Sequence, residues 1–199
     1  ADDYERLGST VVDLGNKFAT TEEEIVALAT RMAATGDMVG MNESDMLAYA
    51  AAISSVGIEA EAGGSAISKL FKRIEEAVAV YDVAKEAIDS TGEEIRDLEL
   101  LQSNHSKTFK SIADDIGLTS TELSSYIKNV RELEDYATIA SMKPGEFIQS
   151  WEDNAAAALE GFIAGLGRIE EESGNAVLTL EEMGITEVRL SNAVLALAS

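Results

Sequence analysis

Side chains that commonly carry chemistry are scarce in this sequence. The chain has a single histidine, His105, and no cysteine. Catalytic triads that use a second histidine or a cysteine, and zinc sites built from histidines or thiolates, therefore lack the side chains they need. His105 stands between Asn104 and Ser106, and we interpret it as a solvent-exposed histidine in a polar turn.

Two carboxylate runs and one glycine pair remain as candidate sites. Glu22-Glu23-Glu24 and Glu170-Glu171-Glu172 have the side chains of a metal or acid–base site, but they fit better as solvated helix ends. Gly63-Gly64-Ser65 resembles an anion-binding nest, yet no lysine follows at P-loop spacing and no strand precedes it, so we interpret it as a joint between helices. We therefore predict no catalytic, cofactor-binding or metal-binding residue, no cofactor and no enzymatic activity.

The methionines of the N-terminal part and two large aromatic side chains are expected to have structural roles. We expect the methionines of the N-terminal part to fill the core rather than line a ligand surface. They are Met32, Met38, Met41 and Met46. Phe147 and Trp151 are four residues apart on one predicted helix, and we expect core anchors there rather than a stacking platform for bases.

Composition and charge exclude several kinds of partner. The 199 residues are 46% hydrophobic and carry a net charge of −22, with acidic residues outnumbering basic ones along the whole chain. Because no basic stripe could neutralise phosphates, we expect no direct binding to nucleic acid or to an anionic membrane surface. The longest apolar run, around Ala48 to Ile53, is too short to span a bilayer. The chain starts Ala1-Asp2-Asp3 without an initiator methionine, and we interpret it as a segment of a longer protein.

Strand signals are absent, whereas helix signals recur, so the chain is predicted to be all-α. One pattern occurs three times: an apolar residue, a glycine, a second apolar residue and a capping residue, with another apolar residue four positions beyond the cap. The copies are Val39-Gly40-Met41-Asn42 with Met46, Ile116-Gly117-Leu118-Thr119 with Leu123, and Met183-Gly184-Ile185-Thr186 with Leu190. Each glycine is expected to close one helix, and the next apolar residue to contact the fourth residue of the following helix. Met142-Lys143-Pro144 with Phe147 is a variant without glycine.

These joints predict a multi-helix array of short helices connected by glycine turns. Further helix boundaries are predicted at Thr21, which would form a capping box with Glu24, at Gly36 as the end of that helix, and at Asp153 or Asn154 as an N-cap. Gly161 and Gly165 are four residues apart in the last of these helices, where they either admit a neighbouring backbone or merely weaken the helix.

A long apolar seam runs through the middle of the chain with alternating spacings of three and four residues. Its members are Ile67, Leu70, Ile74, Ala77, Tyr81, Ala84, Ile88, Thr91, Ile95, Leu98 and Gln102. This spacing predicts a longer coiled-coil-like hairpin arm. Two alternatives are open at Gly92: the helix continues through it, or Ser90-Thr91-Gly92-Glu93 caps a new helix.

The stretch from Met38 to Phe71 organises the chain as two helices around a bent joint. Gly57 is expected to end the first helix in a left-handed conformation, and Ser65 to cap the second after the flexible pair Gly63-Gly64.

The segment Val56 to Lys69, with the sequence VGIEAEAGGSAISK, resembles the core region of tail tape measure proteins of long-tailed phages and prophages. The resemblance continues through Ala155 to Ala198, which contains Ser173-Gly174-Asn175-Ala176 and the run Met183 to Ser191. Leu14-Gly15-Asn16 followed by Thr20-Thr21 is a third match. The segment from about Glu76 to Glu134 matches least and looks like an insertion.

Three parts follow from this resemblance: an N-terminal helical part of the core (1–75), a helical insertion or hairpin arm (76–134) and a C-terminal helical part of the core (135–199). The resemblance implies a virion structural protein that templates tail tube assembly, sets tail length and leaves the tube ahead of the genome at infection. It implies assembly in the host cytoplasm and residence in the lumen of the tail tube. The implied partners are the tail tube protein, tail assembly chaperones, tail tip proteins and further copies of the chain. The alternative is a free-standing helical adaptor or interaction domain with no phage role.

Overall fold

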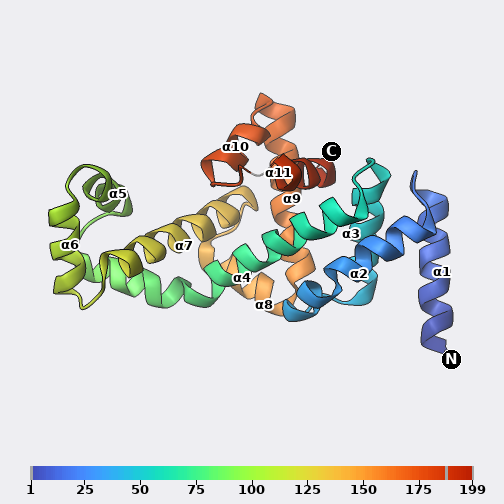
Figure 1. Cartoon of the computed structure of the whole chain (residues 1–199), viewed down its shortest axis with the longest axis horizontal. Helices are drawn as coiled ribbons and strands as arrows, with labels where there is room; N and C mark the ends of the chain where they lie inside the picture. The colour runs from blue at the N-terminus through green and yellow to red at the C-terminus, as the bar shows by residue number, and fades with distance from the viewer. Residues whose placement is uncertain (1, 187, 199) are drawn as a thin grey trace. The chain divides into compact units, whose positions relative to one another are not determined.

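The computed structural model describes residues 2–186 and 188–198, with the side chains of residues 5, 7–186, 188, 191–195, 197 and 198. These residues form eleven α-helices and no strand, which confirms the all-α prediction (Figure 1). The helices are α1 (Asp2–Lys17), α2 (Glu22–Met38), α3 (Glu43–Ser55), α4 (Ala60–Thr91), α5 (Ile95–Asn104), α6 (Ser106–Asp115), α7 (Ser120–Ile139), α8 (Pro144–Asp153), α9 (Ala155–Ser173), α10 (Ala176–Glu182) and α11 (Val188–Ala198).

The chain divides into two units. Unit 1 comprises Ala1–Arg73 and Ala137–Ser199, and unit 2 is the intervening Ile74–Tyr136. The chain therefore leaves unit 1 within α4 and returns to it within α7.

The three predicted glycine joints share one backbone geometry. Gly40, Gly117 and Gly184 have φ values of 72°, 76° and 73°, in the left-handed region that glycine enters at little cost. In each joint the amide after the glycine donates to a carbonyl five residues back, the hydrogen bond that defines a Schellman motif. These bonds are Met41 N to Gly36 O (2.9 Å), Leu118 N to Ala113 O (2.9 Å) and Ile185 N to Leu180 O (2.8 Å).

The caps that follow the first two joints also agree with the prediction. Asn42 Oδ1 accepts from Asp45 N at 2.9 Å, and Thr119 forms a reciprocal capping box with Glu122. In the third joint, the side chain of Leu190 lies outside the described set.

The glycine-free joint before α8 uses the same geometry with serine at the left-handed position. Ser141 has φ 60°, and Met142 N donates to Ala137 O at 2.8 Å. Pro144 is the first residue of α8, and Glu146 accepts a hydrogen bond from Lys143 N at 2.9 Å. Arg168 donates to Ser141 Oγ at 2.9 Å, so the strained residue is held by a side chain from α9.

The joint between α3 and α4 is shorter than predicted. Gly57 has φ 79°, which confirms it as the left-handed residue that ends α3. Ser65 is not a cap, because α4 begins at Ala60 and contains Gly63, Gly64 and Ser65 in its first turns. The anion-nest alternative fails for the same reason.

Close packing of helices explains this glycine pair. A Cβ on Gly63 would lie 2.8 Å from Ile53 Cγ2, and one on Gly64 would lie 2.7 Å from Arg31 Cβ. Both distances are shorter than real Cβ contacts, so the absence of side chains at Gly63 and Gly64 lets α4 pack close to α2 and α3.

The prediction that Gly36 ends a helix is also wrong. Gly36 lies buried inside α2, where a Cβ would meet Met46 Sδ at 2.5 Å.

Unit 1 is built on contacts of α2 with α3 and of α9 with α8 and α11. Three aromatic rings anchor its core: Phe147 and Trp151 stack with centroids 6.4 Å apart, and Phe71 meets Trp151 edge-on at 6.5 Å. Both Phe147 and Trp151 are buried, as predicted for core anchors. The expectation for the methionines holds for Met32, Met41 and Met46 but is wrong for Met38, which is 50% exposed at the end of α2.

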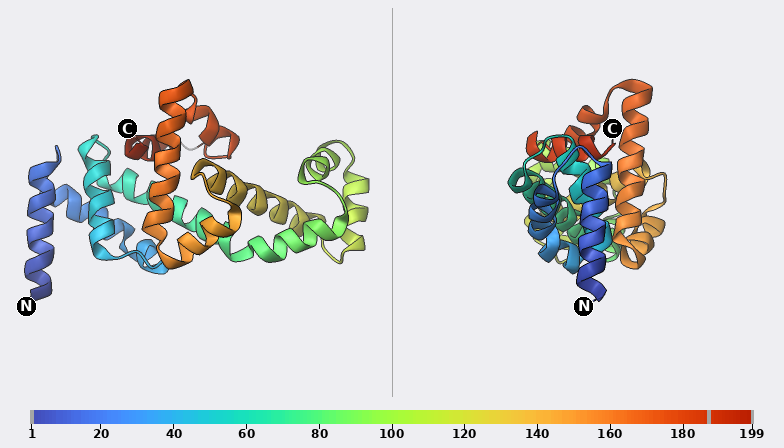
Figure 2. Two further views of the ribbon diagram at one scale, coloured as in Figure 1. Left: turned by 180° about the vertical axis from the view of Figure 1, so that it is seen from behind. Right: turned by 90° about the vertical axis from the view of Figure 1, so that its right-hand side faces the viewer.

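Unit 2 is a four-helix cluster made by the second half of α4, by α5 and α6, and by the first part of α7. Its fully buried core residues are Ala84, Ile88, Leu98, Phe109, Ala113, Leu123, Ile127 and Val130. Within this unit, α4 and α7 run side by side and α5 and α6 connect them (Figures 1 and 2).

The helix of the predicted arm does not continue through Gly92. Gly92 has φ 74° and follows the last residue of α4, and α5 starts three residues later with Glu94 as its N-cap. The alternative capping box is also wrong, because Thr91 Oγ1 accepts from Glu93 N in a local turn and caps no helix.

Candidate functional site

The candidate residues for chemistry in the sequence belong to different helices or helix junctions. His105 is exposed at the junction of α5 and α6. Glu22, Glu23 and Glu24 form the exposed first turn of α2, where Glu24 completes a capping box with Thr21. Glu170 accepts from Ala176 N at 3.1 Å and so connects α9 to α10. Among the described residues, no group of three or more histidine, aspartate or glutamate side chains is placed to hold a metal ion.

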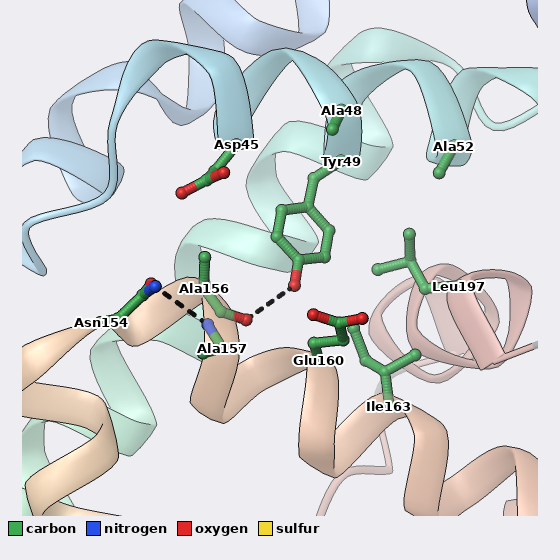
Figure 3. Close-up of a pocket in the computed structure, with 10 residues that line it drawn as sticks. All are labelled: Asp45, Ala48, Tyr49, Ala52, Asn154, Ala156, Ala157, Glu160, Ile163 and Leu197. Atoms are coloured by element: carbon green, nitrogen blue, oxygen red, sulfur yellow. Dashed lines mark hydrogen bonds between the residues drawn. The ribbon is translucent and has the colours of Figure 1, made fainter.

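A pocket of about 420 Å³ lies in unit 1 between α3, α9 and α11 (Figure 3). Its lining consists of small and aliphatic side chains, one tyrosine, one asparagine and two carboxylates. These residues are Asp45, Ala48, Tyr49, Ala52, Asn154, Ala156, Ala157, Glu160, Ile163 and Leu197. No lysine or arginine is among them.

Tyr49 stands at the centre of this pocket. Its ring reaches from α3 toward α9, where the hydroxyl donates to Ala156 O at 3.1 Å (Figure 3). Burial raises the pKa of the Tyr49 hydroxyl well above its ordinary value, and the nearby carboxylates of Glu160 and Asp45 raise it further. Tyr49 is therefore a neutral donor at neutral pH, fixed in a negative environment.

The two carboxylates come from different elements. Asp45 lies in the first turn of α3, where its Oδ2 accepts from Asn42 Nδ2 at 2.8 Å. Glu160 lies on α9 with its carboxylate turned toward the Tyr49 hydroxyl (Figure 3). Asn154 is the N-cap of α9 and accepts from Ala157 N at 3.2 Å, which confirms one of the two predicted caps.

Sequence reasoning did not find this pocket. Tyr49 and Ala156 are 107 residues apart, and neither belongs to a motif with recognisable spacing. The only local signal was Asn154 as a helix cap, which positions the first turn of α9 but does not indicate what faces it.

A second, apolar groove of about 230 Å³ lies between α1, α2 and α3. It is lined by Leu7, Val11, Val26, Ala29, Thr30, Ala33, Glu43, Met46 and Leu47. Leu7 and Val26 are 42% and 46% exposed, so this face of unit 1 presents apolar side chains to solvent.

Several basic side chains are engaged within the chain. Arg73 donates to the carbonyls of Met183 and Gly184 at 2.9 and 3.1 Å, and Arg168 donates to Ile139 O at 3.3 Å. Each arginine thus places positive charge at the carboxyl end of another helix, where it complements the helix dipole. Lys17, Lys85, Lys110, Lys128 and Arg131 form ion pairs with acidic side chains.

In the described part of the chain, no helix combines the length and apolar character that crossing a membrane requires.

Comparison with protein families finds a match over about two thirds of the chain. The model of the family described as phage-related minor tail protein matches residues 1–130. No curated protein and no solved structure matches the chain.

Proposed function

The chain belongs to the phage-related minor tail protein family, and from this membership we propose that it is a folded segment of a tail tape measure protein. In that role it takes part in templating the tail tube, contributes to tail length and lies in the tube lumen until the protein leaves ahead of the genome.

The family match is the observation that carries the proposal. Residues 1–130 include the segment Val56 to Lys69, whose sequence resembles the tape measure core. This segment forms the end of α3, the Gly57 joint and the first turns of α4.

The fold suggests how such a segment contributes to a tape. A helix rises about 1.5 Å per residue, so an uninterrupted helix gives the greatest length for a given number of residues. Here left-handed residues follow α2, α3, α4, α6, α7, α9 and α10, and within each unit consecutive helices pack against each other, such as α2 with α3 and α5 with α6. We therefore propose a compact segment along a longer tape.

We further propose that residues 1–75 and 135–199 are the N-terminal and C-terminal parts of the tape measure core and that residues 76–134 are a helical insertion. The proposed partners are the tail tube protein, tail assembly chaperones, tail tip proteins and other copies of the chain.

The alternative from the sequence is a free-standing helical adaptor with no phage role, which membership of a phage tail family disfavours. The apolar groove between α1, α2 and α3 is the surface that such an adaptor would use. Mass spectrometry of purified tails discriminates the two functions, because an adaptor without a phage role is absent from the tails.

The test of length setting is an in-frame replacement of residues 76–134 by a short glycine–serine linker in the phage that encodes the chain. We expect uniformly shorter tails in negative-stain electron micrographs. The loss should be well below the roughly 90 Å that 59 residues span as one straight helix, because α4 and α7 run back along each other.

Gly57→Val is the matched control, because it disturbs a joint without removing residues. Gly57 has a positive φ, which valine adopts only at a high cost in free energy, so the variant segment should be less stable. We therefore expect fewer finished tails, but of unchanged length. Tails that contain the chain but keep their length after the replacement would contradict a length-setting role. Tails of a new uniform length in Gly57→Val would contradict the compact-segment model.

A further inference from the structure

We propose that the pocket around Tyr49 binds a lysine or arginine side chain of a protein partner. The proposal concerns unit 1 by itself and does not depend on the tape measure role.

The first argument is the balance of donors and acceptors in the pocket. Tyr49 donates its only hydroxyl hydrogen to Ala156 O, so the lone pairs of its oxygen remain available as acceptors. The carboxylates of Asp45 and Glu160 add acceptors only. Apart from the amide of Asn154, the lining side chains offer an incoming group acceptors rather than donors. Lysine, arginine and tryptophan carry donors only, and of these three only lysine and arginine are positively charged.

The second argument is charge. Neither carboxylate forms an ion pair with a basic side chain in the described part of the chain, and the pocket lining contains no lysine or arginine. Both carboxylates are close enough to the Tyr49 hydroxyl to raise its pKa, so their negative potential acts at the same place. A cation in the pocket would relieve this unbalanced charge, and a neutral or anionic group would not.

The third argument is the shape and character of the walls. A cavity of about 420 Å³ falls at the low end of the range of roughly 300–1,000 Å³ for ligand pockets, so it suits a side chain rather than a large cofactor. Four alanines with Ile163 and Leu197 form apolar walls that match the aliphatic stem of a lysine or arginine. The face of the Tyr49 ring can add a cation–π contact.

The fixed geometry of the pocket favours binding. Tyr49 is tied to Ala156, Asp45 is tied to Asn42, and Asn154 is tied to the first turn of α9. A partner side chain would therefore enter a site that needs little rearrangement, which limits the entropic cost of binding.

The test is a nuclear magnetic resonance titration of the ¹⁵N-labelled 199-residue chain with the peptide acetyl-Ala-Lys-Ala-amide, its arginine counterpart and its glutamine counterpart. We expect the basic peptides to shift the amide resonances of Asp45, Tyr49, Ala157 and Glu160, and the glutamine peptide to leave them unchanged. Raising the salt concentration should weaken binding, since the attraction is partly electrostatic.

Two variants test the assignment. Glu160→Gln removes one pocket carboxylate and should weaken binding of the basic peptides about tenfold. Glu171→Gln removes the same charge from an exposed position on α9 outside the pocket and should leave the affinity unchanged. Equal loss in both variants, shifts spread evenly over the acidic surface, or equal shifts from the glutamine peptide would overturn the proposal. Tighter binding of free spermidine than of both basic peptides would overturn the choice of a protein side chain as the occupant.

Discussion

Gly165 and Gly161 lie one turn apart on α9 and have different surroundings. A Cβ on Gly165 would stand 1.9 Å from Ile139 O and 2.6 Å from Ile139 C, both backbone atoms of α7. A Cβ on Gly161 would stand 3.5 Å from Met142 Cε and 3.6 Å from Ala140 Cβ, which are ordinary contacts. Of the two alternatives left open by the sequence, close approach of a backbone therefore applies to Gly165 only.

We expect Gly165→Ala to lower the free energy of unfolding by about 1–3 kcal/mol or more, because a backbone carbonyl cannot move aside as a flexible side chain can. Gly161→Ala is the control and should be neutral or stabilising by up to about 1 kcal/mol, since alanine favours the helix. Urea unfolding followed by circular dichroism measures both. Equal effects of the two substitutions would show that the contact with Ile139 is absent.

At the scale of helices, α4 has a different role in each unit. Its first part carries the close-packed glycines Gly63 and Gly64 against α2 and α3 of unit 1. Its second part places Ala84 and Ile88 in the core of unit 2, where α5, α6 and α7 complete the cluster. Most of the apolar seam is thus buried on both sides of the boundary at Arg73, whereas Tyr81, Thr91 and Ile95 are partly buried and Gln102 is exposed.

Ile88→Asp should destabilise unit 2 by about 3–5 kcal/mol, because it places an uncompensated charge in an apolar cluster. Val83→Asp is the matched control on the same helix: Val83 is 60% exposed, so its replacement should have little effect. Hydrogen exchange measured by mass spectrometry should show faster exchange in α5 and α6 for the first variant only. Unchanged protection in Ile88→Asp would mean that this part of the seam is exposed in solution.

The sequence predicted helix ends better than helix contacts. The joints at Gly40, Gly57 and Gly117 were found because capping and left-handed glycine are local properties, readable within about six residues. Gly36 and Gly63 were misread because their partners, Met46 and Ile53, are at least ten residues away and a glycine needed for close packing looks like a glycine needed for a turn. The Tyr49 pocket was missed for the same reason, since it exists only after α3, α9 and α11 have packed together.

At the scale of the whole molecule, the dominant property is the net charge of −22. The five ion pairs described above have mostly exposed partners, and exposed pairs contribute little to stability. Self-repulsion of the excess negative charge should therefore outweigh them at low ionic strength.

We expect the melting temperature to rise when sodium chloride is raised from about 0.1 M to about 1 M, over which the screening length falls from about 10 Å to about 3 Å. For a chain of this size, each kcal/mol gained corresponds to a rise of roughly 2–4 °C. Potassium chloride should give the same rise, because screening does not depend on which cation is used. A fall in melting temperature with salt would show that the ion pairs contribute more than the repulsion costs.

The insertion of unit 2 between the two segments of unit 1 determines how the chain responds to mechanical force. Both ends of unit 2, at Ile74 and Tyr136, continue directly into unit 1. If the chain is pulled by its two termini, the tension passes through the contacts of unit 1, and unit 2 bears no load until those contacts break. Once they break, the 63 residues of Ile74–Tyr136 can release roughly 200 Å of extended chain in a second step. Stretching the chain by its termini should therefore unfold unit 1 first and unit 2 second.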